Sequence, residues 1–379
     1  MIPSDWHVKR LGEIGEALIG LTYKPTEVRD HGTLVLRSSN IQNDALAFDD
    51  NVFVHADIPD RIKVRPNDVL ICVRNGSRDL IGKSALLDER TKGMTFGAFM
   101  AVYRSPIGKL ASYLFQSPIL KRQISEHLGA TINQITNKSL NAFLAPVPPS
   151  GAEQRAIATA LSDVDALIDG LTRLIAKKRD LKQAAMQQLL TGQTRLPGFS
   201  GEWEVKLLGD IAHIKTGSRN NEDKIEDGAY PFYVRSATVE RINSYSHDCE
   251  AVLVPGEGQI GNIFHYINGR FDVHQRVYAI TQFADSVSGR YVHLYMSQHF
   301  GTWAMQNTVK ATVDSLRLPT FQTFEIRLPP TLEEQTVIAT ILADMDAELA
   351  ALEARLTKTR ALKQAMMSEL LTGKTRLPT

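Results

Sequence analysis

The residues best suited to phosphate chemistry lie at 76–84, where the sequence reads GSRDLIGKS. A Walker A loop needs the spacing G-x-x-x-x-G-K-[ST], because consecutive backbone N–H groups must wrap the phosphates. Here five residues instead of four separate the two glycines, and a second near match at 373–375 has Ser368 where the first glycine belongs. Neither stretch predicts a nucleotide-binding site.

Motifs of other reactions are absent as well. The sequence has no glycine-rich dinucleotide fingerprint, no HExxH zinc motif and no Asn/Asp-Pro-Pro-aromatic motif of an amino-methyltransferase. The ten histidines are scattered, and the two cysteines, Cys72 and Cys249, have no spacing typical of metal ligands or of a disulfide framework. We therefore expect a protein with no catalytic residues, no metal site and no cofactor of its own.

The element that must position any functional residues occurs twice, at 153–197 and 334–378. The two segments align without a gap at an offset of 181 residues, and 25 of the 45 aligned positions are identical. Repetition at such a long period indicates that the whole architecture is duplicated.

Both copies predict a long helix. Residues 150–153 and 331–334 fit the S/T-x-x-E capping box, and Gly192 and Gly373 follow the last apolar positions as stop signals. About 37 helical residues would span roughly 55 Å at a rise of about 1.5 Å each. A helix of this length with one narrow apolar stripe needs a partner, and the other copy is the nearest candidate.

Apolar residues follow each helix in steps of three and four, which is the pattern of a coiled-coil seam. We predict that the interface consists of Ile157, Leu161, Val164, Ile168, Leu171, Ile175, Leu181, Leu189, Ile338, Leu342, Met345, Leu349, Leu352, Leu356, Leu362, Met366 and Leu370.

Charge predicts the direction of pairing. In each copy the acidic residues precede the basic ones, as Asp163 and Asp165 precede Arg179 and Lys182 in the first. A parallel pair in register would place like charges together, whereas an antiparallel pair places acids beside bases. We therefore predict antiparallel helices, although the same gradient would also complement each helix dipole.

The segments before the helices repeat more faintly. WHVKRLGEI at 6–14 matches WEVKLLGDI at 203–211, and the regions that follow hold short β-branched runs between Gly, Asn, Asp and Pro. Short helices are expected at 110–128 and 289–306. The prediction is an α+β fold, in which two related globular domains are separated by two long antiparallel coiled-coil helices with pseudo-twofold symmetry. The boundaries are 1–149 and 193–330 for the domains, 150–192 and 331–373 for the helices, and 374–379 for a tail.

The composition is that of an ordinary globular protein. Of the 379 residues 43% are hydrophobic and 22% charged, and the net charge of +1 neither requires nor excludes a nucleic-acid partner. No run approaches the roughly 18–20 apolar residues of a membrane helix. Because the N-terminus has no apolar signal segment, we expect a cytoplasmic protein that does not associate with membranes.

This combination resembles the specificity subunit of type I restriction-modification systems. The resemblance is carried by the two W-x-V-x-x-L-G-[ED]-I openings, the P-P…E-Q-x-x-I-A start of each long helix and the duplicated plan. It implies a subunit without catalysis, whose two domains are target-recognition domains that each read half of an asymmetric, bipartite site in double-stranded DNA. The helices would set the gap between the halves and dock two methyltransferase subunits, which hold S-adenosylmethionine. Motor and nuclease subunits can join such a complex.

Base reading requires Arg, Lys, Asn, Gln, Ser or Thr side chains on loops, and backbone binding requires cations and amides. The candidate DNA-binding residues are Arg37, Ser38, Asn40, Arg74, Asn75, Ser77, Arg78, Lys83, Thr131, Asn133 and Gln134 in the first domain, and Arg235, Ser236, Gln259, Asn262, His274, Gln275, Arg276 and Thr312 in the second. The alternative function is a coiled-coil adaptor whose two heads bind proteins. Salt-dependent, sequence-selective DNA binding would separate the two, because phosphate contacts impose a steep salt dependence.

Overall fold

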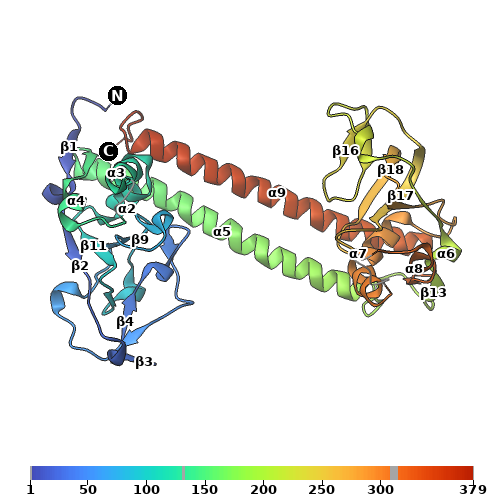
Figure 1. Cartoon of the computed structure of the whole chain (residues 1–379), viewed down its shortest axis with the longest axis horizontal. Helices are drawn as coiled ribbons and strands as arrows, with labels where there is room; N and C mark the ends of the chain where they lie inside the picture. The colour runs from blue at the N-terminus through green and yellow to red at the C-terminus, as the bar shows by residue number, and fades with distance from the viewer. Residues whose placement is uncertain (1, 130–132, 308–314, 379) are drawn as a thin grey trace. The chain divides into compact units, whose positions relative to one another are not determined.

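The computed structural model describes residues 2–129, 133–307 and 315–378. The chain forms two compact units: unit 1 contains residues 1–172 and 354–379, and unit 2 contains residues 173–353. Each unit therefore combines one globular domain with part of both long helices, α5 (Gly151–Leu189) and α9 (Leu332–Leu370), which are green and red in Figure 1. The boundaries predicted from the sequence separate the helices from the domains, whereas the contacts divide each helix between the two units.

The globular domain of unit 1 contains a central sheet of order β2-β11-β8-β9 and a smaller sheet of order β10-β4-β7-β3. Strand β1 pairs separately with β12, and β5 pairs with β6. The strands are β1 (His7–Arg10), β2 (Glu16–Ile19), β3 (Val28–Arg29), β4 (Thr33–Leu36), β5 (Ile41–Gln42), β6 (Ala45–Leu46), β7 (Phe53–Val54), β8 (Val69–Cys72), β9 (Ser84–Leu86), β10 (Thr95–Phe96), β11 (Met100–Arg104) and β12 (Leu144–Val147). The helices are α1 (Leu11–Ile14), α2 (Gly108–Gln116), α3 (Pro118–Leu128) and α4 (Asn137–Ala142).

Unit 2 follows the same plan with a larger sheet, of order β14-β19-β17-β18-β15-β16, and a separate pair of β13 with β20. The strands are β13 (Glu204–Leu207), β14 (His213–Thr216), β15 (Tyr230–Tyr233), β16 (Glu240–Ile242), β17 (His247–Pro255), β18 (His265–Val273), β19 (Val277–Thr281) and β20 (Glu325–Leu328). The helices are α6 (Leu208–Ile211), α7 (Gly289–Gln306) and α8 (Leu318–Gln322). The order β14-β19-β17 repeats β2-β11-β8 of unit 1, so the predicted duplication of an α+β domain is confirmed.

Each globular core includes the start of one long helix and the end of the other. In unit 1, Leu161 of α5 and Leu370 of α9 are buried in one apolar cluster with the central sheet and α2. In unit 2, Leu342 of α9 and Leu189 of α5 occupy the corresponding places. Full burial of one such side chain stabilises the fold by roughly 1.5–3 kcal/mol, so the helices are integral parts of both cores.

The antiparallel direction of the helices is visible within each unit. In unit 2, Lys178 pairs with Glu348 and Lys182 pairs with Asp346. In unit 1, Lys363 pairs with Asp165, with Nζ 2.7 Å from Oδ1. Acidic segments thus lie beside basic ones, as the charge gradient predicted.

Two predicted interface residues lie outside the seam. Leu181 and Leu362 are 48% and 54% exposed. Leu181 is six positions after Ile175, and at 100° per residue this places it about 120° away around the helix. The seam continues instead through Lys182 in α5 and Thr359 in α9, which are half-buried and buried respectively.

Of the remaining predicted interface residues, nine are buried and six are half-buried. The buried ones are Ile157, Leu161, Leu171, Ile175, Leu189, Ile338, Leu342, Leu349 and Leu370. The half-buried ones are Val164, Ile168, Met345, Leu352, Leu356 and Met366, of which Met366 packs against the unit 1 core.

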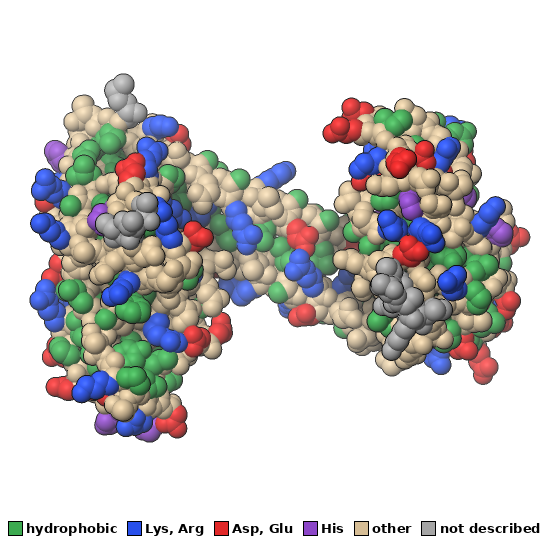
Figure 2. Space-filling view, in the orientation of Figure 1, with side chains coloured by type: hydrophobic (Ala, Val, Ile, Leu, Met, Phe, Trp, Pro, Cys, Tyr) green, Lys and Arg blue, Asp and Glu red, His purple; other side chains and the backbone are tan. Residues whose placement is uncertain are grey.

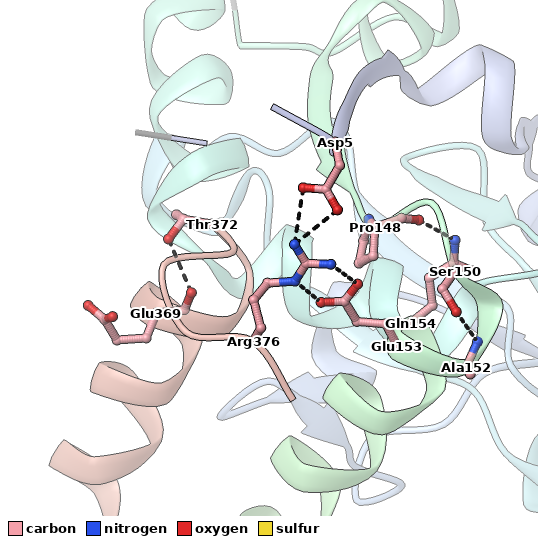
Figure 3. A network of polar contacts seen from close by, with 9 residues as sticks. All are labelled: Asp5, Pro148, Ser150, Ala152, Glu153, Gln154, Glu369, Thr372 and Arg376. Carbon is pink, nitrogen blue, oxygen red and sulfur yellow. Dashed lines mark hydrogen bonds and ion pairs between the residues drawn. The ribbon is translucent and has the colours of Figure 1, made fainter. Parts of the chain in front are cut away.

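The start of α5 is held by a polar network that we call the Arg376 clasp (Figure 3). Arg376 donates to both oxygens of Glu153 and, through Nη1, to Asp5 at 3.0 and 3.1 Å. Its guanidinium carbon also lies 5.8 Å from the centre of the Trp6 ring. The network therefore ties both chain ends to the first turn of α5.

Unit 2 contains the equivalent Arg195 clasp. Arg195 donates to Glu334 at 2.7 and 2.8 Å and to the Gly201 carbonyl at 2.6 Å, and its guanidinium carbon lies 5.8 Å from the centre of the Trp203 ring. The capping-box prediction is therefore half right. Thr331 accepts from the Glu334 amide at 3.2 Å, but the glutamate side chain binds the arginine.

The clasps explain the repeated motif residues. Gln154 donates to the Pro148 carbonyl at 2.8 Å, and Gln335 donates to the Pro329 carbonyl at 3.1 Å. Gly192 has a left-handed backbone, with φ of 73°, and a Cβ on it would lie 3.2 Å from the Trp203 ring. The P-P…E-Q, tryptophan and glycine signals are therefore parts of one local structure.

Candidate nucleic-acid interface

In unit 1, the ends of β8 and β11 form an edge with an exposed aromatic side chain. Cys72, the last residue of β8, pairs with Met100, the first residue of β11, and Arg74 then forms an isolated bridge with Gln134. The guanidinium carbon of Arg74 lies 5.1 Å from the centre of the Phe99 ring. Phe99 is 59% exposed, so one ring face meets a cation while much of the side chain remains open to a partner.

A cavity of about 570 Å³ opens beside this edge. It is lined by Leu21, Thr22, Tyr23, Arg37, Ser38, Ser39, Asp50, Arg74, Asn75, Gly97, Ala98, Phe99 and Met100. Four of the predicted DNA-binding residues, Arg37, Ser38, Arg74 and Asn75, thus come together here. Arg37 pairs with Asp50 at 2.9 Å, and within the described part of the chain Arg37 Nε is buried without a partner. Donors and an exposed ring therefore share one concave surface.

Asn40 is not a DNA-reading residue. Its side chain is fully buried, accepts from the Arg37 amide at 2.9 Å and donates to the Ala47 carbonyl at 2.9 Å. An asparagine in a loop offers the same residue type whether it contacts a ligand or satisfies the backbone of its own turn. Here it does the latter, and the prediction for this residue is wrong.

The other candidates of unit 1 occupy two further places. Arg78 and Lys83 line a separate cavity of about 360 Å³, where Arg78 donates to the Ser125 carbonyl at 3.3 Å. Ser77 is exposed on the preceding loop. Asn133 and Gln134 are exposed next to Arg74, whereas Thr131 lies outside the described residues.

The same edge of unit 2 carries ionic groups. Val277 of β19 pairs with Pro255 of β17, and Glu257 then forms an isolated bridge with Ser315. The Glu257 carboxylate lies 3.1 Å from Arg276 Nη1 and 3.5 Å from Arg235 Nη1. Both arginines are more than half exposed, and the carboxylate between them is 23% exposed.

His274 is a buried residue that binds the backbone of this edge. It is 5% exposed, and its Nδ1 accepts from the Arg276 amide at 3.0 Å. Burial and the nearby Arg235 and Arg276 charges lower the pKa of His274. A neutral ring is therefore the form that accepts this bond, so His274 shapes the backbone instead of reading DNA, and that prediction is corrected.

The remaining candidates of unit 2 are spread over the adjoining loops. Gln259 and Asn262 are exposed after β17, and Gln275 donates to Asn220. Ser236 donates to the Thr238 carbonyl at 2.9 Å. Thr312 lies outside the described residues.

Two edge residues, Phe99 and Glu257, were missed by sequence reasoning. Phe99 is apolar and directly precedes a strand, so its type suggests core. Glu257 is acidic, and the residue types expected to read bases were Arg, Lys, Asn, Gln, Ser and Thr. A sequence signal for Glu257 exists: the run VLI at 69–71 resembles VLV at 252–254, and the same offset of 183 residues places Glu257 opposite Arg74.

The surface charge is mixed in both units. Figure 2 shows Lys and Arg side chains interspersed with acidic ones on the visible face of each. No group of three or more His, Cys, Asp or Glu in the described ranges could hold a metal ion. Among the helices that the structure describes, none is long and apolar enough to cross a bilayer.

Comparison with known proteins gives a consistent result. The family model of the type I restriction modification DNA specificity domain matches residues 3–178 and 200–360. The StySPI specificity subunit of Salmonella potsdam is 26% identical and aligns over 98% of this chain and 89% of its own. The MjaVIII specificity subunit of Methanocaldococcus jannaschii is 24% identical, over 99% and 94%.

Solved structures show the same fold. The S subunit from M. genitalium superposes with a TM-score of 0.65 at 17% identity, over 98% of this chain and 96% of that one. The HsdS subunit from Thermoanaerobacter tengcongensis gives a TM-score of 0.51 at 20% identity, over 99% and 98%.

Proposed function

The chain belongs to the type I restriction-modification DNA specificity family, and on this premise we propose that each unit reads one half of an asymmetric, bipartite site in double-stranded DNA. As a specificity subunit the chain is not itself an enzyme. In this proposal the long helices dock two methyltransferase subunits, which hold S-adenosylmethionine and carry out the chemistry. Motor and nuclease subunits join the same complex.

The observation that carries the proposal is the pair of matched edges. In both units the ends of two antiparallel strands carry exposed side chains at the same register, yet these side chains differ. Unit 1 offers Arg74 and Phe99, whereas unit 2 offers Glu257 between two arginines. Two domains that share a fold but carry different side chains at these edges would select different base sequences.

The helices supply a surface that suits protein partners. Leu174 and Leu181 of α5, both in unit 2, are 39% and 48% exposed. Their spacing of seven residues places them on one helix face. An exposed apolar row outside the helix seam favours the docking of a further subunit.

Methylation mapping of a host strain with and without this chain, in the presence of its methyltransferase, tests the function. We expect one asymmetric bipartite motif to lose methylation when the chain is absent. Exchange of residues 198–330 for those of another specificity subunit should change one half of the motif only. Unchanged methylation everywhere would favour the adaptor function instead.

The proposed site of action is the cytoplasm, where the genome of a bacterial or archaeal cell lies. Two observations agree with a reducing compartment. Cys72 is buried, Cys249 is half-buried, and neither forms a disulfide. Burial raises the pKa of both thiols, so they are poorly suited to disulfide exchange.

A further inference from the structure

Three positions of the two edges can be matched from strand register. The first follows the last residue of β4 or β15 by two positions, and the second follows the last paired residue of β8 or β17 by two positions. The third directly precedes β11 or β19. The matched pairs are Ser38 with Arg235, Arg74 with Glu257, and Phe99 with Arg276.

The two sets of side chains have the same net charge but different hydrogen-bonding character. In unit 1 only Arg74 is charged, which gives +1. In unit 2 the two arginines and Glu257 also sum to +1. The attraction for phosphates is therefore matched, whereas an acceptor in unit 2 occupies the position of a donor in unit 1.

An acceptor at this position has a specific use. A guanidinium offers only donors, which suit guanine O6 and N7, whereas a carboxylate accepts from the amino group of cytosine or adenine. A lone carboxylate facing DNA would be repelled by phosphates. Here Arg235 and Arg276 lie 3.5 and 3.1 Å from the Glu257 oxygens and offset that repulsion.

We propose that Glu257 is a specificity-determining residue of unit 2, which accepts a hydrogen bond from a base amino group while Arg235 and Arg276 hold its carboxylate in place. Arg74, with Phe99 beside it, is the donor counterpart in unit 1. This inference rests on the proposed function, because it assigns a base contact to one of the two DNA-reading edges.

The test compares Glu257→Ala with the wild type in the complex with the methyltransferase subunits, by methylation of a library in which every position of the target is varied. We expect discrimination at one base pair of the unit 2 half-site to fall about tenfold or more, because a good base contact contributes a factor of this size. All positions read by unit 1 should be unchanged. Total DNA binding should not fall, since the local charge rises from +1 to +2.

Two further variants make the result decisive. Glu257→Leu removes both carboxylate acceptors, keeps a side chain of similar size and replaces Glu257→Ala if the latter does not fold. Glu240→Ala is the matched control, because it removes another ion-paired carboxylate of unit 2, on β16, where Lys224 is its partner. It should leave base selection unchanged.

Three results would overturn the inference. A library profile of Glu257→Ala identical to that of the wild type would show that the carboxylate reads no base. A loss spread over both half-sites would show that it acts through the fold. If the wild type itself selects no bipartite motif, the proposed function falls together with the inference, whereas the first two results leave that function standing.

Discussion

The two clasps make one arrangement of side chains in two ways. In unit 2 the chain runs without a break from the end of α5 through Arg195 and Trp203 to the next strand. In unit 1 the same arrangement is assembled from the two ends of the chain, because Arg376 approaches Trp6 and Glu153 from the far end of the sequence. Contacts, and not chain continuity, therefore define the repeated unit.

Removal of a clasp arginine should have the largest effect, because a buried carboxylate loses its cation. Glu334 is 1% exposed, so Arg195→Ala should lower the free energy of local unfolding by about 3–5 kcal/mol. In unit 1 the clasp arginine is more exposed, 43% against 26% for Arg195, so water already reaches the pair more easily and Arg376→Ala should cost less, about 1–3 kcal/mol. Hydrogen exchange of residues 153–164 and 334–345 measures the two effects separately.

The control for this pair of variants is the second substitution Glu334→Gln in the Arg195→Ala background, which removes the buried charge and should recover much of the loss. Equal losses in the two units would show that the exposure of the clasp arginine has no influence on the cost.

Equivalent buried leucines of the two long helices should stabilise their units by similar amounts. Leu161 and Leu342 are equivalent and fully buried, so substitution of either by alanine should cost about 2–5 kcal/mol in its own unit. Leu181→Ala and Leu362→Ala are matched controls on the same helices and should cost well under 1 kcal/mol, because both side chains are about half exposed. Urea titration followed by hydrogen exchange reports each unit. If Leu181→Ala lowered the free energy of unfolding by several kcal/mol, Leu181 would belong to the helix interface after all.

The matched ion pairs of the helices should differ by a smaller amount. Lys363 bonds Asp165, lies 5.5 Å from the centre of the Tyr113 ring and is only 14% exposed. Lys182 bonds Asp346, and it is 22% exposed against a partner that is 51% exposed. Lys363→Met should therefore destabilise unit 1 by about 1–2 kcal/mol, and Lys182→Met should destabilise unit 2 by about 0.2–1 kcal/mol.

The phenol of Tyr113 strengthens the unit 1 pair. It donates to Asp165 at 2.8 Å, and burial together with the Asp165 charge raises its pKa. Tyr113→Phe should therefore bring the cost of Lys363→Met closer to that of Lys182→Met. Identical costs for the two lysine variants without this change would contradict the role given to Tyr113.

The repeated elements were predictable because their signals are local. Periodicity, glycine stops and charge order specified both long helices and their direction, and strands followed from β-branched runs such as those of β8 and β19. The helix expected at 110–128 is divided, because Pro118 cannot continue the α2 hydrogen-bond ladder and begins α3 instead. The prediction for Leu181 was wrong because the sequence does not show that the half-buried Lys182, and not the apolar Leu181, continues the helix interface.

The site was predictable only in part, since residue type does not reveal which loops meet. Arg74 and Asn75 follow strand β8, and the structure places both in the lining of one cavity. Asn40 and His274 have suitable types, but their own backbone neighbours satisfy them. Phe99 became visible only when strand register matched the two edges, whereas Glu257 could have been matched to Arg74 by the 183-residue offset.

The smallest expected effect is on the salt dependence of DNA binding, which substitutions at the two edges should change in opposite directions. Arg74→Ala removes the only charge among the three matched positions of unit 1, so the slope of log K against log salt should become shallower by about 1. Glu257→Ala frees Arg235 and Arg276 for phosphate contacts, so the slope should become steeper by up to about 1. Binding of the complex to a nonspecific duplex, titrated between low and moderate salt, gives both slopes. If both variants shift the slope in the same direction, the two edges do not balance phosphate attraction in the way their charges indicate.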